Sequence, residues 1–196
     1  MITLLTPTAA YEEDWQTPCS HYLRLLGAET ACVCWTEPRD ISGHGVVLPL
    51  LVWGYQRATS TWYALLDRLE QAGSTVINPV ALLRWNSDKS YLFDLERAGV
   101  PIIPSRLVQA LDAAALAAAR ATWGCDRLVV KPLVSGGADG TFLLSGADPV
   151  PPAWAGRAML VQPFLPAIAE EGEYSLFYFD GAYSHAIVKR PAAGDF

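Results

Sequence analysis

A glycine-rich loop lies between two strand-like segments in "LVVKPLVSGGADGTFLL", residues 128–144. Both flanking runs are apolar and rich in residues that favour strands, so the pattern predicts a β-hairpin. The common phosphate-binding glycine loops lead from a strand into a helix N-terminus. The loop from Ser135 to Thr141 leads into a second strand instead. It therefore requires a different geometry from those motifs.

Upstream of this hairpin, strand-like and helix-like segments alternate. Short apolar runs predict four strands, at Ile2 to Thr6, Thr30 to Trp35, Val46 to Tyr55 and "TVINP". Pro49 places the third strand at an edge or in an irregular position. Helices are predicted before Gly27 and over Thr61 to Gly73, because a terminal glycine is a natural C-cap. This alternation predicts a small parallel α/β domain over residues 1–84.

The second half of the chain has a different pattern. Asn86 or Ser87 is expected to N-cap a helix that runs to Gly99, and Asp112 to Gly124 predicts an alanine-rich helix. Antiparallel strands are predicted from residue 128 onward, with Asp180-Gly181 as a hairpin turn. The fold class is therefore α/β plus α+β. The predicted divisions are 1–84, then a linker helix and lid subdomain with the glycine loop over 85–158, then the start of a C-terminal lobe over 159–196.

Composition excludes several classes of protein. Of 196 residues, 52% are apolar and 17% are charged, which favours a buried core and excludes global disorder. The net charge is -6 and no basic run occurs, so non-specific nucleic-acid binding is not expected. The longest apolar run, Val46 to Trp53, is too short to span a bilayer. The N-terminus does not resemble a signal peptide, so the expected compartment is the cytoplasm.

The cysteines and histidines do not form a recognisable motif. The four cysteines are few and unevenly spaced for a disulfide framework: Cys19, Cys32, Cys34 and Cys125. Cys32 and Cys34 fall on one face of a predicted strand, and we interpret the cysteines as buried free thiols. The three histidines share no metal-ligand spacing with them: His21, His44 and His185. His185 is interpreted as structural.

The sequence also lacks G-x-S-x-G, G-x-x-x-x-G-K-[ST], G-x-G-x-x-G and H-E-x-x-H, so the usual hydrolase, P-loop, dinucleotide and zincin assignments have no support.

Several separated features of the sequence nevertheless suit the binding of one ligand. Lys131 lies late in a strand beside the loop, where Gly136, Gly137 and Gly140 allow backbone N–H groups to face an anion. Lys89, expected on the first turn of a helix, is a second point charge suited to phosphate.

A segment downstream offers contacts for a nucleotide base and sugar. In "LVQPFL", Leu160 to Leu165, the carbonyl of Pro163 and the N–H of Leu165 can pair with an adenine amino group and ring nitrogen. Glu173 offers a carboxylate for ribose hydroxyls. Trp53 and Tyr55 lie at a strand end, where they could line an acceptor site, but core packing is the favoured role. Asp139 is interpreted as a turn former.

Three segments together resemble a known family: "NPVALLRWNSDKSYLFDLERAGVPIIPS", "LVVKPLVSGGADGTFLL" and "LVQPFLPAIAEEGEYSLFYFDGAYSHAIVKRPAAGDF". Their order and spacing resemble ATP-grasp proteins of the glutathione synthetase and ribosomal-S6-modification type. They are closer still to bacterial ligases related to the cycloserine-forming cyclo-ligase. The resemblance covers most of the chain from Asn78 onward. It implies a pre-ATP-grasp α/β domain followed by an incomplete ATP-grasp domain with an antiparallel-sheet lid subdomain.

The resemblance also implies roles for individual residues. In that family the glycine loop joins two strands and folds over the phosphates of ATP as a lid, which explains why it lies in a hairpin. The implied phosphate contacts are Lys89, Lys131, Ser135, Gly136 and Gly137. The implied adenine contacts are Gln162, Pro163, Phe164 and Leu165. Glu173 would bind ribose, and Lys189 with its neighbour Arg190 would lie near the γ-phosphate and the acyl phosphate as catalytic groups.

The implied activity is an ATP-dependent carboxylate–amine or carboxylate–nucleophile ligase that acts through an acyl phosphate. Its cofactors would be ATP and Mg²⁺, and its partners a small carboxylate and an amine-type acceptor, in a possible homodimer. In the family, "GDF" is followed by arginine and then by acidic and asparagine residues that hold magnesium, whereas this sequence stops at Phe196. The chain is therefore expected to be a fragment of a longer enzyme, with its metal ligands beyond Phe196, and to be inactive alone.

Two alternatives stay open at this point. The first is a non-catalytic ATP- or ADP-binding or regulatory module that lacks the metal site. The second is an α/β structural domain whose glycine loop is only a hairpin, which predicts that ATP has no effect on thermal stability.

Overall fold

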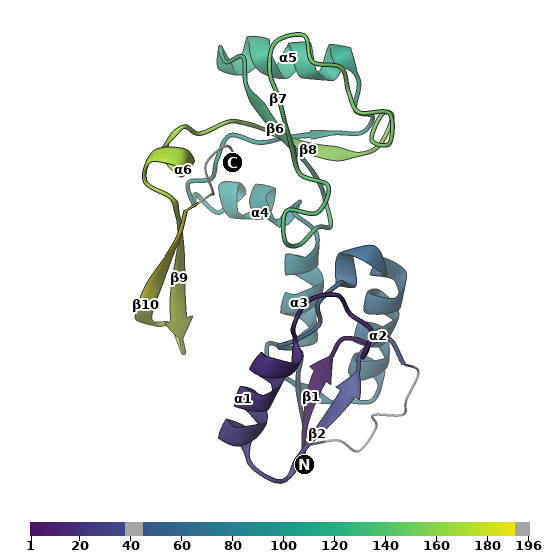
Figure 1. Cartoon of the computed structure of the whole chain (residues 1–196). Coiled ribbons are helices and arrows are strands. Elements are labelled where there is room, and N and C mark those ends of the chain that lie inside the picture. Colours follow the sequence, from purple (N-terminus) through teal and green to yellow (C-terminus); the bar gives the residue numbers. More distant parts are fainter. Residues whose placement is uncertain (38–44, 191–196) are drawn as a thin grey trace. The chain divides into compact units, whose positions relative to one another are not determined.

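The computed structural model describes residues 1–37 and 45–190, so His44 and the residues after Arg190 lie outside the described part (Figure 1). The chain forms two compact units. The N-terminal unit comprises Met1–Val100 together with Leu133–Gly140, and the C-terminal unit comprises Pro101–Pro132 and Thr141–Phe196. Within the described residues, no helix is long and apolar enough to cross a membrane.

A four-stranded parallel sheet forms the centre of the N-terminal unit, in the order β2-β1-β3-β4. The strands are β1 (Ile2–Thr6), β2 (Thr30–Cys34), β3 (Val46–Leu48) and β4 (Thr75–Val76). The predicted parallel α/β arrangement is thereby confirmed.

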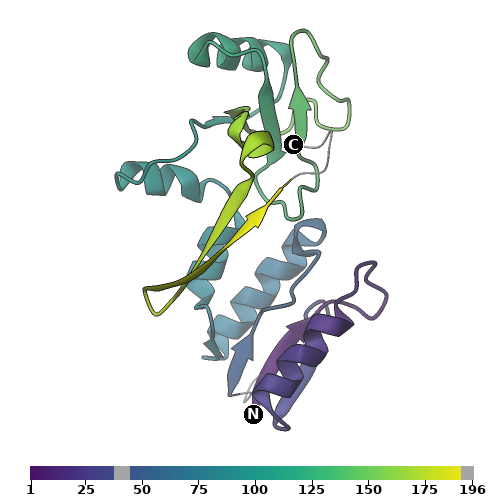
Figure 2. The same cartoon turned by 60° about the vertical axis from the view of Figure 1, so that its left-hand side comes forward.

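Helices cover both faces of this sheet. Neighbouring residues of a strand point to opposite sides, so each face presents apolar side chains that a helix can bury. The helical elements are α1 (Gln16–Leu26), η1 (Tyr55–Arg57), α2 (Thr59–Gln71), α3 (Val80–Ser87) and α4 (Tyr91–Arg97). Leu5 packs with Leu65, Leu66 and Leu69 of α2. The adjacent Leu4 packs with Cys19 of α1 on the other face. The turned view shows α1 running alongside the N-terminal strands (Figure 2).

Two predicted elements are wrong in extent. The third strand was expected to reach Tyr55, but β3 ends at Leu48, because Pro49 has no N–H to donate to a sheet ladder. The helix expected from Asn86 or Ser87 to Gly99 is instead two helices, α3 and α4. The break lies at Asp88, which has extended backbone angles.

This break corrects the predicted cap as well. Asn86 and Ser87 end α3 and do not begin a helix. The Ser87 hydroxyl donates to the Leu83 carbonyl at 2.7 Å and accepts from the Trp62 indole N–H at 2.8 Å. Lys89 consequently lies before α4, whose N-cap is Ser90, and not in the first turn of a helix.

The C-terminal unit contains a four-stranded antiparallel sheet in the order β5-β8-β6-β7. The strands are β5 (Arg106–Val108), β6 (Leu128–Pro132), β7 (Phe142–Leu144) and β8 (Met159–Pro163). Helix α5 (Ala113–Trp123) packs on this sheet, and its Leu116 and Ala119 join the buried core beside Val130 and Val161. The predicted hairpin with a glycine loop between β6 and β7 is thus confirmed.

A short helix and a second hairpin complete this unit: α6 (Ala167–Glu170), β9 (Glu173–Phe179) and β10 (Ala182–Lys189). The turn between β9 and β10 is the predicted Asp180-Gly181, and both residues have positive φ, 49° and 75°. This combination is typical of a tight two-residue hairpin turn, and it confirms the prediction.

The cysteine interpretation is partly corrected. All four cysteines are free thiols, as expected, but only Cys19 is buried and Cys32 is exposed. Cys32 is exposed because β2 is an edge strand of the sheet.

The side chain of Asp112 caps the N-terminus of α5. The Asp112 carboxylate accepts a hydrogen bond from the Ala115 N–H at 2.7 Å. We expect Asp112→Ala to lower the free energy of unfolding by about 1 kcal/mol. For a chain of this size the melting temperature would fall by about 2–4 °C. Asp112→Asn keeps an acceptor at this position and should be nearly neutral, so an equal loss in both variants, measured by calorimetry, would contradict the capping role.

Candidate functional site

In the C-terminal unit, Lys131 lies near the end of β6 beside β8, where its backbone pairs with Leu160. Burial of its side chain lowers the pKa of the ammonium group, and the negative charge of Glu173 partly opposes this shift. A half-buried ammonium has lost part of its hydration. It therefore gains more than an exposed lysine does when an anion comes into contact with it.

The segment that follows β8 is held by contacts within the same unit. Gln162 is buried, and its Nε2 donates to the Ser105 hydroxyl at 2.7 Å. The Phe164 N–H donates to the Arg127 carbonyl at 3.0 Å, and the Arg127 guanidinium lies 3.8 Å from the centre of the Phe164 ring. The carbonyl of Leu165 accepts from the Ile168 N–H at 3.1 Å. The end of β8 and the two residues after it, Phe164 and Leu165, are thus held in place by contacts within this unit.

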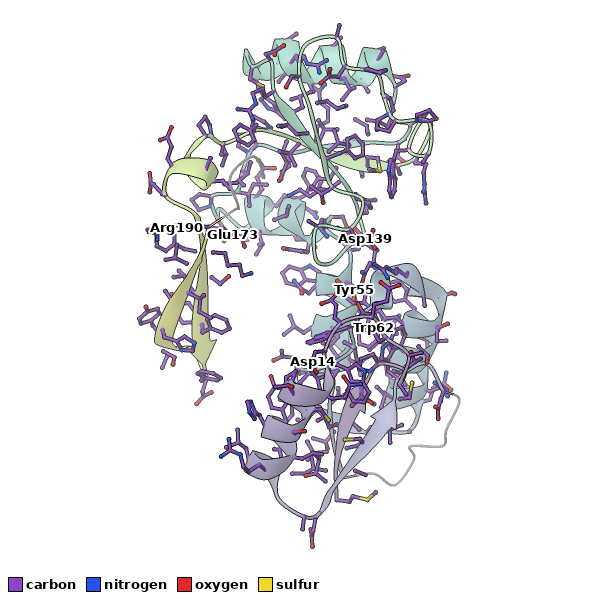
Figure 3. The ribbon with its side chains drawn as sticks, in the orientation of Figure 1. Asp14, Tyr55, Trp62, Asp139, Glu173 and Arg190 are labelled. Atoms are coloured by element: carbon purple, nitrogen blue, oxygen red, sulfur yellow. The ribbon has the colours of Figure 1, made fainter. Side chains whose placement is uncertain are left out.

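Glu173 and Lys189 are partners across the β9–β10 hairpin. The Lys189 Nζ lies 3.8 Å from the Glu173 Oε1, and both side chains are more than half exposed. Arg190 follows directly and is exposed. Figure 3 shows Glu173 and Arg190 at the open end of this hairpin. The end of the hairpin therefore combines one accessible carboxylate with two accessible cations.

Gly172 is a feature of this hairpin that sequence reasoning missed. Its φ is +100°, and a Cβ added there would lie 2.7 Å from the Lys189 carbonyl oxygen. Only glycine can bring the start of β9 this close to the end of β10. The "EEGEYS" sequence contains this glycine, but its role depends on contact with a residue far along the chain.

In the N-terminal unit, the glycine loop is attached to protein groups at both of its ends. The backbone N–H of Lys89 donates to the Leu133 carbonyl at 2.8 Å, and its Nζ donates to the Ser135 carbonyl at 2.9 Å. Asp139 accepts from the Arg57 Nε at 3.1 Å and from the Gln56 Nε2 at 3.4 Å. Gly137 and Gly140 have positive φ, 58° and 71°, and so does Ala138, at 60°.

A cavity of about 320 Å³ lies next to the loop in this unit. Its lining includes aromatic, charged and loop residues: Tyr11, Trp53, Tyr55, Arg57, Gly136, Gly137 and Asp139. Trp53 and Tyr55 also pack against the core, as expected, so each of them contacts both the core and the cavity. Asp139 is more than the predicted turn former, because its carboxylate binds Arg57; Figure 3 shows Asp139 and Tyr55 in this part of the unit. Neither Gln56 nor Arg57 was singled out from the sequence, since nothing local marks them.

The contacts of Asp139 predict that its replacement loosens the glycine loop but changes the overall stability of the protein only slightly. Exposed ion pairs contribute about 0–1 kcal/mol, so Asp139→Ala should change the melting temperature by no more than about 2–4 °C. Amide hydrogen exchange over residues 135–140 should nevertheless become several-fold faster, because the acceptor for Arg57 and Gln56 is lost. Asp67→Ala, which removes an ion pair with Arg84, is the matched control and should leave this loop unchanged. Unchanged exchange in Asp139→Ala would contradict the attachment.

The predicted site residues thus fall in two groups. Lys89, Ser135, Gly136 and Gly137 belong to the N-terminal unit. The C-terminal unit holds the others: Lys131, Gln162, Pro163, Phe164, Leu165, Glu173, Lys189 and Arg190. The chain contains only three lysines, and each of them is one of these predicted residues. Among residues 1–37 and 45–190, no cluster of three or more His, Cys, Asp or Glu side chains is arranged to hold a metal ion.

Comparison with known proteins identifies the family of this chain. A family model described as "D-cycloserine synthetase DcsG, N-terminal domain" matches residues 2–78. The cycloserine biosynthesis protein DcsG of Streptomyces lavendulae is 32% identical over 208 residues, which cover 96% of this chain and 67% of that protein. A crystal structure of D-cycloserine synthetase DcsG has a TM-score of 0.82 at 27% identity and likewise covers 96% of this chain and 67% of that one.

More distant relatives define the wider class. A RimK domain ATP-grasp protein of Sphaerobacter thermophilus shares the fold, with a TM-score of 0.56, 21% identity and coverage of 85% of this chain and 65% of that one. A glutathione synthetase of Prochlorococcus marinus is 32% identical over 151 residues, 73% of this chain and 45% of that protein. The class that these relatives share is the ATP-grasp ligases. The chain belongs to the ATP-grasp family, in the group of the D-cycloserine synthetase DcsG.

Proposed function

We propose that this protein is an ATP-dependent carboxylate–amine or carboxylate–nucleophile ligase that acts through an acyl phosphate. The observation that carries the proposal is the composition of the C-terminal unit. It combines a half-buried lysine on β6, a segment held in place at the end of β8, and a carboxylate paired with a lysine across β9 and β10. Family membership supplies the chemical class.

In the C-terminal unit, Pro163 and Leu165 would present their backbone groups to adenine, with Gln162 and Phe164 keeping this segment in place. Glu173 would accept hydrogen bonds from ribose hydroxyls, and its exposed carboxylate is suited to that role. Lys131 would contact the phosphates. From the N-terminal unit we assign Lys89 and the loop residues Ser135, Gly136 and Gly137 to the phosphates as well.

ATP supplies a γ-phosphoryl group that activates the substrate carboxylate. The contribution of this chain would be positioning and charge stabilisation, which provide most of the catalysis in phosphoryl transfer. Lys189, with Arg190 beside it, would stabilise the negative charge that develops on the transferred group. Displacement of the phosphate by an amine then forms the product, and no side chain of this chain becomes covalently modified.

Magnesium is proposed as the second cofactor, as is general for ATP-grasp enzymes. We assign no metal ligand to the residues that the structure describes, which contain no cluster of three or more His, Cys, Asp or Glu side chains suited to a metal ion. The division at residues 84 and 158, and a homodimer, are likewise proposals. Light scattering of the purified protein tests the dimer.

One experiment separates the ligase from the alternative of a non-catalytic nucleotide-binding module. ATP is titrated calorimetrically into this chain and into a C-terminally extended chain, and ADP release is then measured with a panel of small carboxylates and amines. The ligase proposal expects ATP binding by both chains and substrate-dependent ADP release by the extended one. Binding without any turnover in the extended chain would favour the non-catalytic module. No binding by either chain would reject both and favour a structural domain.

A further inference from the structure

Two thiols of the N-terminal unit are in contact although they belong to different elements. Cys19 lies on α1 and Cys32 on β2, and their Sγ atoms are 3.5 Å apart. Both are free. A disulfide bond is about 2.05 Å long, so the two sulfur atoms would need to approach by roughly 1.5 Å.

The register of the sheet explains why these two side chains meet. Cys32 is the partner of Leu4 in the parallel pairing of β2 with β1, so both side chains point to the same face. Leu4 packs with Cys19 on that face, where α1 covers the sheet. The contact therefore follows from the fold and is not confined to a mobile loop.

The two thiols differ in their exposure to solvent. Cys19 is 5% exposed, whereas Cys32 is exposed at the edge of the sheet. Burial raises the pKa of the Cys19 thiol to about 11, and the neighbouring Cys32 adds to this effect. A small oxidant from solvent therefore reaches Cys32 first, and Cys19 is protected from direct attack but close enough to react next.

We propose that Cys19 and Cys32 form a reversible disulfide that ties α1 to the edge strand β2 when the protein meets a peroxide. The Cys32 thiolate attacks hydrogen peroxide, forms a sulfenic acid and releases hydroxide, which is protonated to water. The Cys19 sulfur then attacks the Cys32 sulfur, the S–O bond breaks, and the Cys19 proton leaves with the hydroxide as a second water. Two thiols are oxidised and one peroxide is reduced, and a dithiol reductant reverses the reaction.

The other cysteines provide internal controls. The Cys34 Sγ lies 3.2 Å from the Thr36 hydroxyl, and Cys125 belongs to the C-terminal unit. Neither is placed against Cys19. The proposal does not depend on the ligase function, because both residues lie outside the proposed nucleotide contacts.

The test is titration of the reduced protein with hydrogen peroxide, followed by thiol counting, intact mass measurement and peptide mapping without reductant. We expect the four free thiols to fall to two and the mass to fall by two hydrogen atoms. Trypsin should release residues 1–24 joined to residues 25–39. The melting temperature should rise by about 5 °C or more and return when a dithiol reductant is added.

Single variants identify the bridge. Cys32→Ser and Cys19→Ser should abolish the joined peptide, whereas Cys34→Ser and Cys125→Ser should leave it unchanged. If Cys19→Ser fails to fold, Cys19→Ala preserves an apolar side chain at this buried position. A joined peptide that persists in Cys32→Ser, or conversion of Cys32 to a sulfinic acid without a bridge, would overturn the proposal.

Discussion

Replacement of Lys131 by methionine should weaken ATP binding by about 10- to 100-fold, which corresponds to one charge-assisted contact with phosphate. Methionine keeps an unbranched apolar side chain and removes the ammonium group, so the fold should remain intact. Circular dichroism of the variant verifies this, and isothermal titration calorimetry measures the affinity. Lys131 should matter more than an exposed lysine, because burial has already removed part of its water.

A matched variant separates the role of Lys131 in phosphate binding from a general effect of net charge. Arg24→Ala also removes one positive charge, but from an exposed position on α1 outside the proposed contacts. Its ATP affinity should equal that of the unchanged protein. If Lys131→Met and Arg24→Ala bind ATP equally well, the phosphate role of Lys131 is wrong. If both weaken binding, the attraction is only a general effect of net charge.

The lowered pKa of Lys131 predicts a pH dependence with a definite sign. ATP affinity should decline with rising pH before the ordinary lysine value of 10.5, because Lys131 loses its proton earlier than an exposed lysine. The contribution of Lys131 to the free energy of unfolding changes with pH in the opposite direction to the ATP affinity. Between the lowered pKa and 10.5 the unfolded state binds more protons, so the free energy of unfolding contributed by this residue rises with pH. Lys131→Met should remove both effects, and a profile unchanged by the variant would contradict this assignment.

Truncation of Trp62 to alanine should lower the free energy of unfolding of the N-terminal unit by about 3–5 kcal/mol. The side chain is 2% exposed and lies in the core between the sheet and α2. Its ring meets Trp35 edge-on, with centroids 6.2 Å apart, and its indole N–H donates to the Ser87 hydroxyl at 2.8 Å. The melting temperature should fall by about 6–20 °C. Urea denaturation followed by hydrogen exchange in each unit measures the loss.

Trp62→Phe separates the packing of this residue from its hydrogen bond. Phenylalanine fills most of the space but leaves the Ser87 hydroxyl without the indole donor, which should cost about 1–3 kcal/mol. Equal losses in Trp62→Ala and Trp62→Phe would show that the hydrogen bond, and not the ring volume, dominates. A loss below about 1 kcal/mol in Trp62→Ala would contradict its place in the core.

The elements that were predicted correctly are those whose signals are local. Asp112 and Gly124 bound α5 because a carboxylate satisfies the first free N–H groups and glycine accepts the left-handed conformation at the end. Asp180-Gly181 forms the β9–β10 turn for a similar reason. These residues act on their own backbone or on that of neighbours a few positions away, so their effect can be read without the rest of the fold.

The elements that were predicted wrongly depend on competition between local and distant contacts. The apolar run after Leu48 suggested a longer strand, but Pro49 ended the ladder and Leu51 turned into the core against α1. The residue pattern across Asp88 is typical of one continuous helix, but the structure has two helices with a break at this residue. Ser87 was predicted as a cap, and it is instead a buried partner of a tryptophan 25 positions earlier.

The order of strands and helices, the hairpin with its glycine loop, and the family could be predicted from the sequence, since these depend on local propensity and on the spacing of motifs. The pairs of groups that meet across long stretches of chain became visible only in the folded protein: Lys89 with Ser135, Arg57 with Asp139, and Cys19 with Cys32. The physical reason is that such contacts arise from burial and strand register, which act between residues far apart in sequence. A single linear pattern of residue types does not encode which of the many compatible pairs will be brought together.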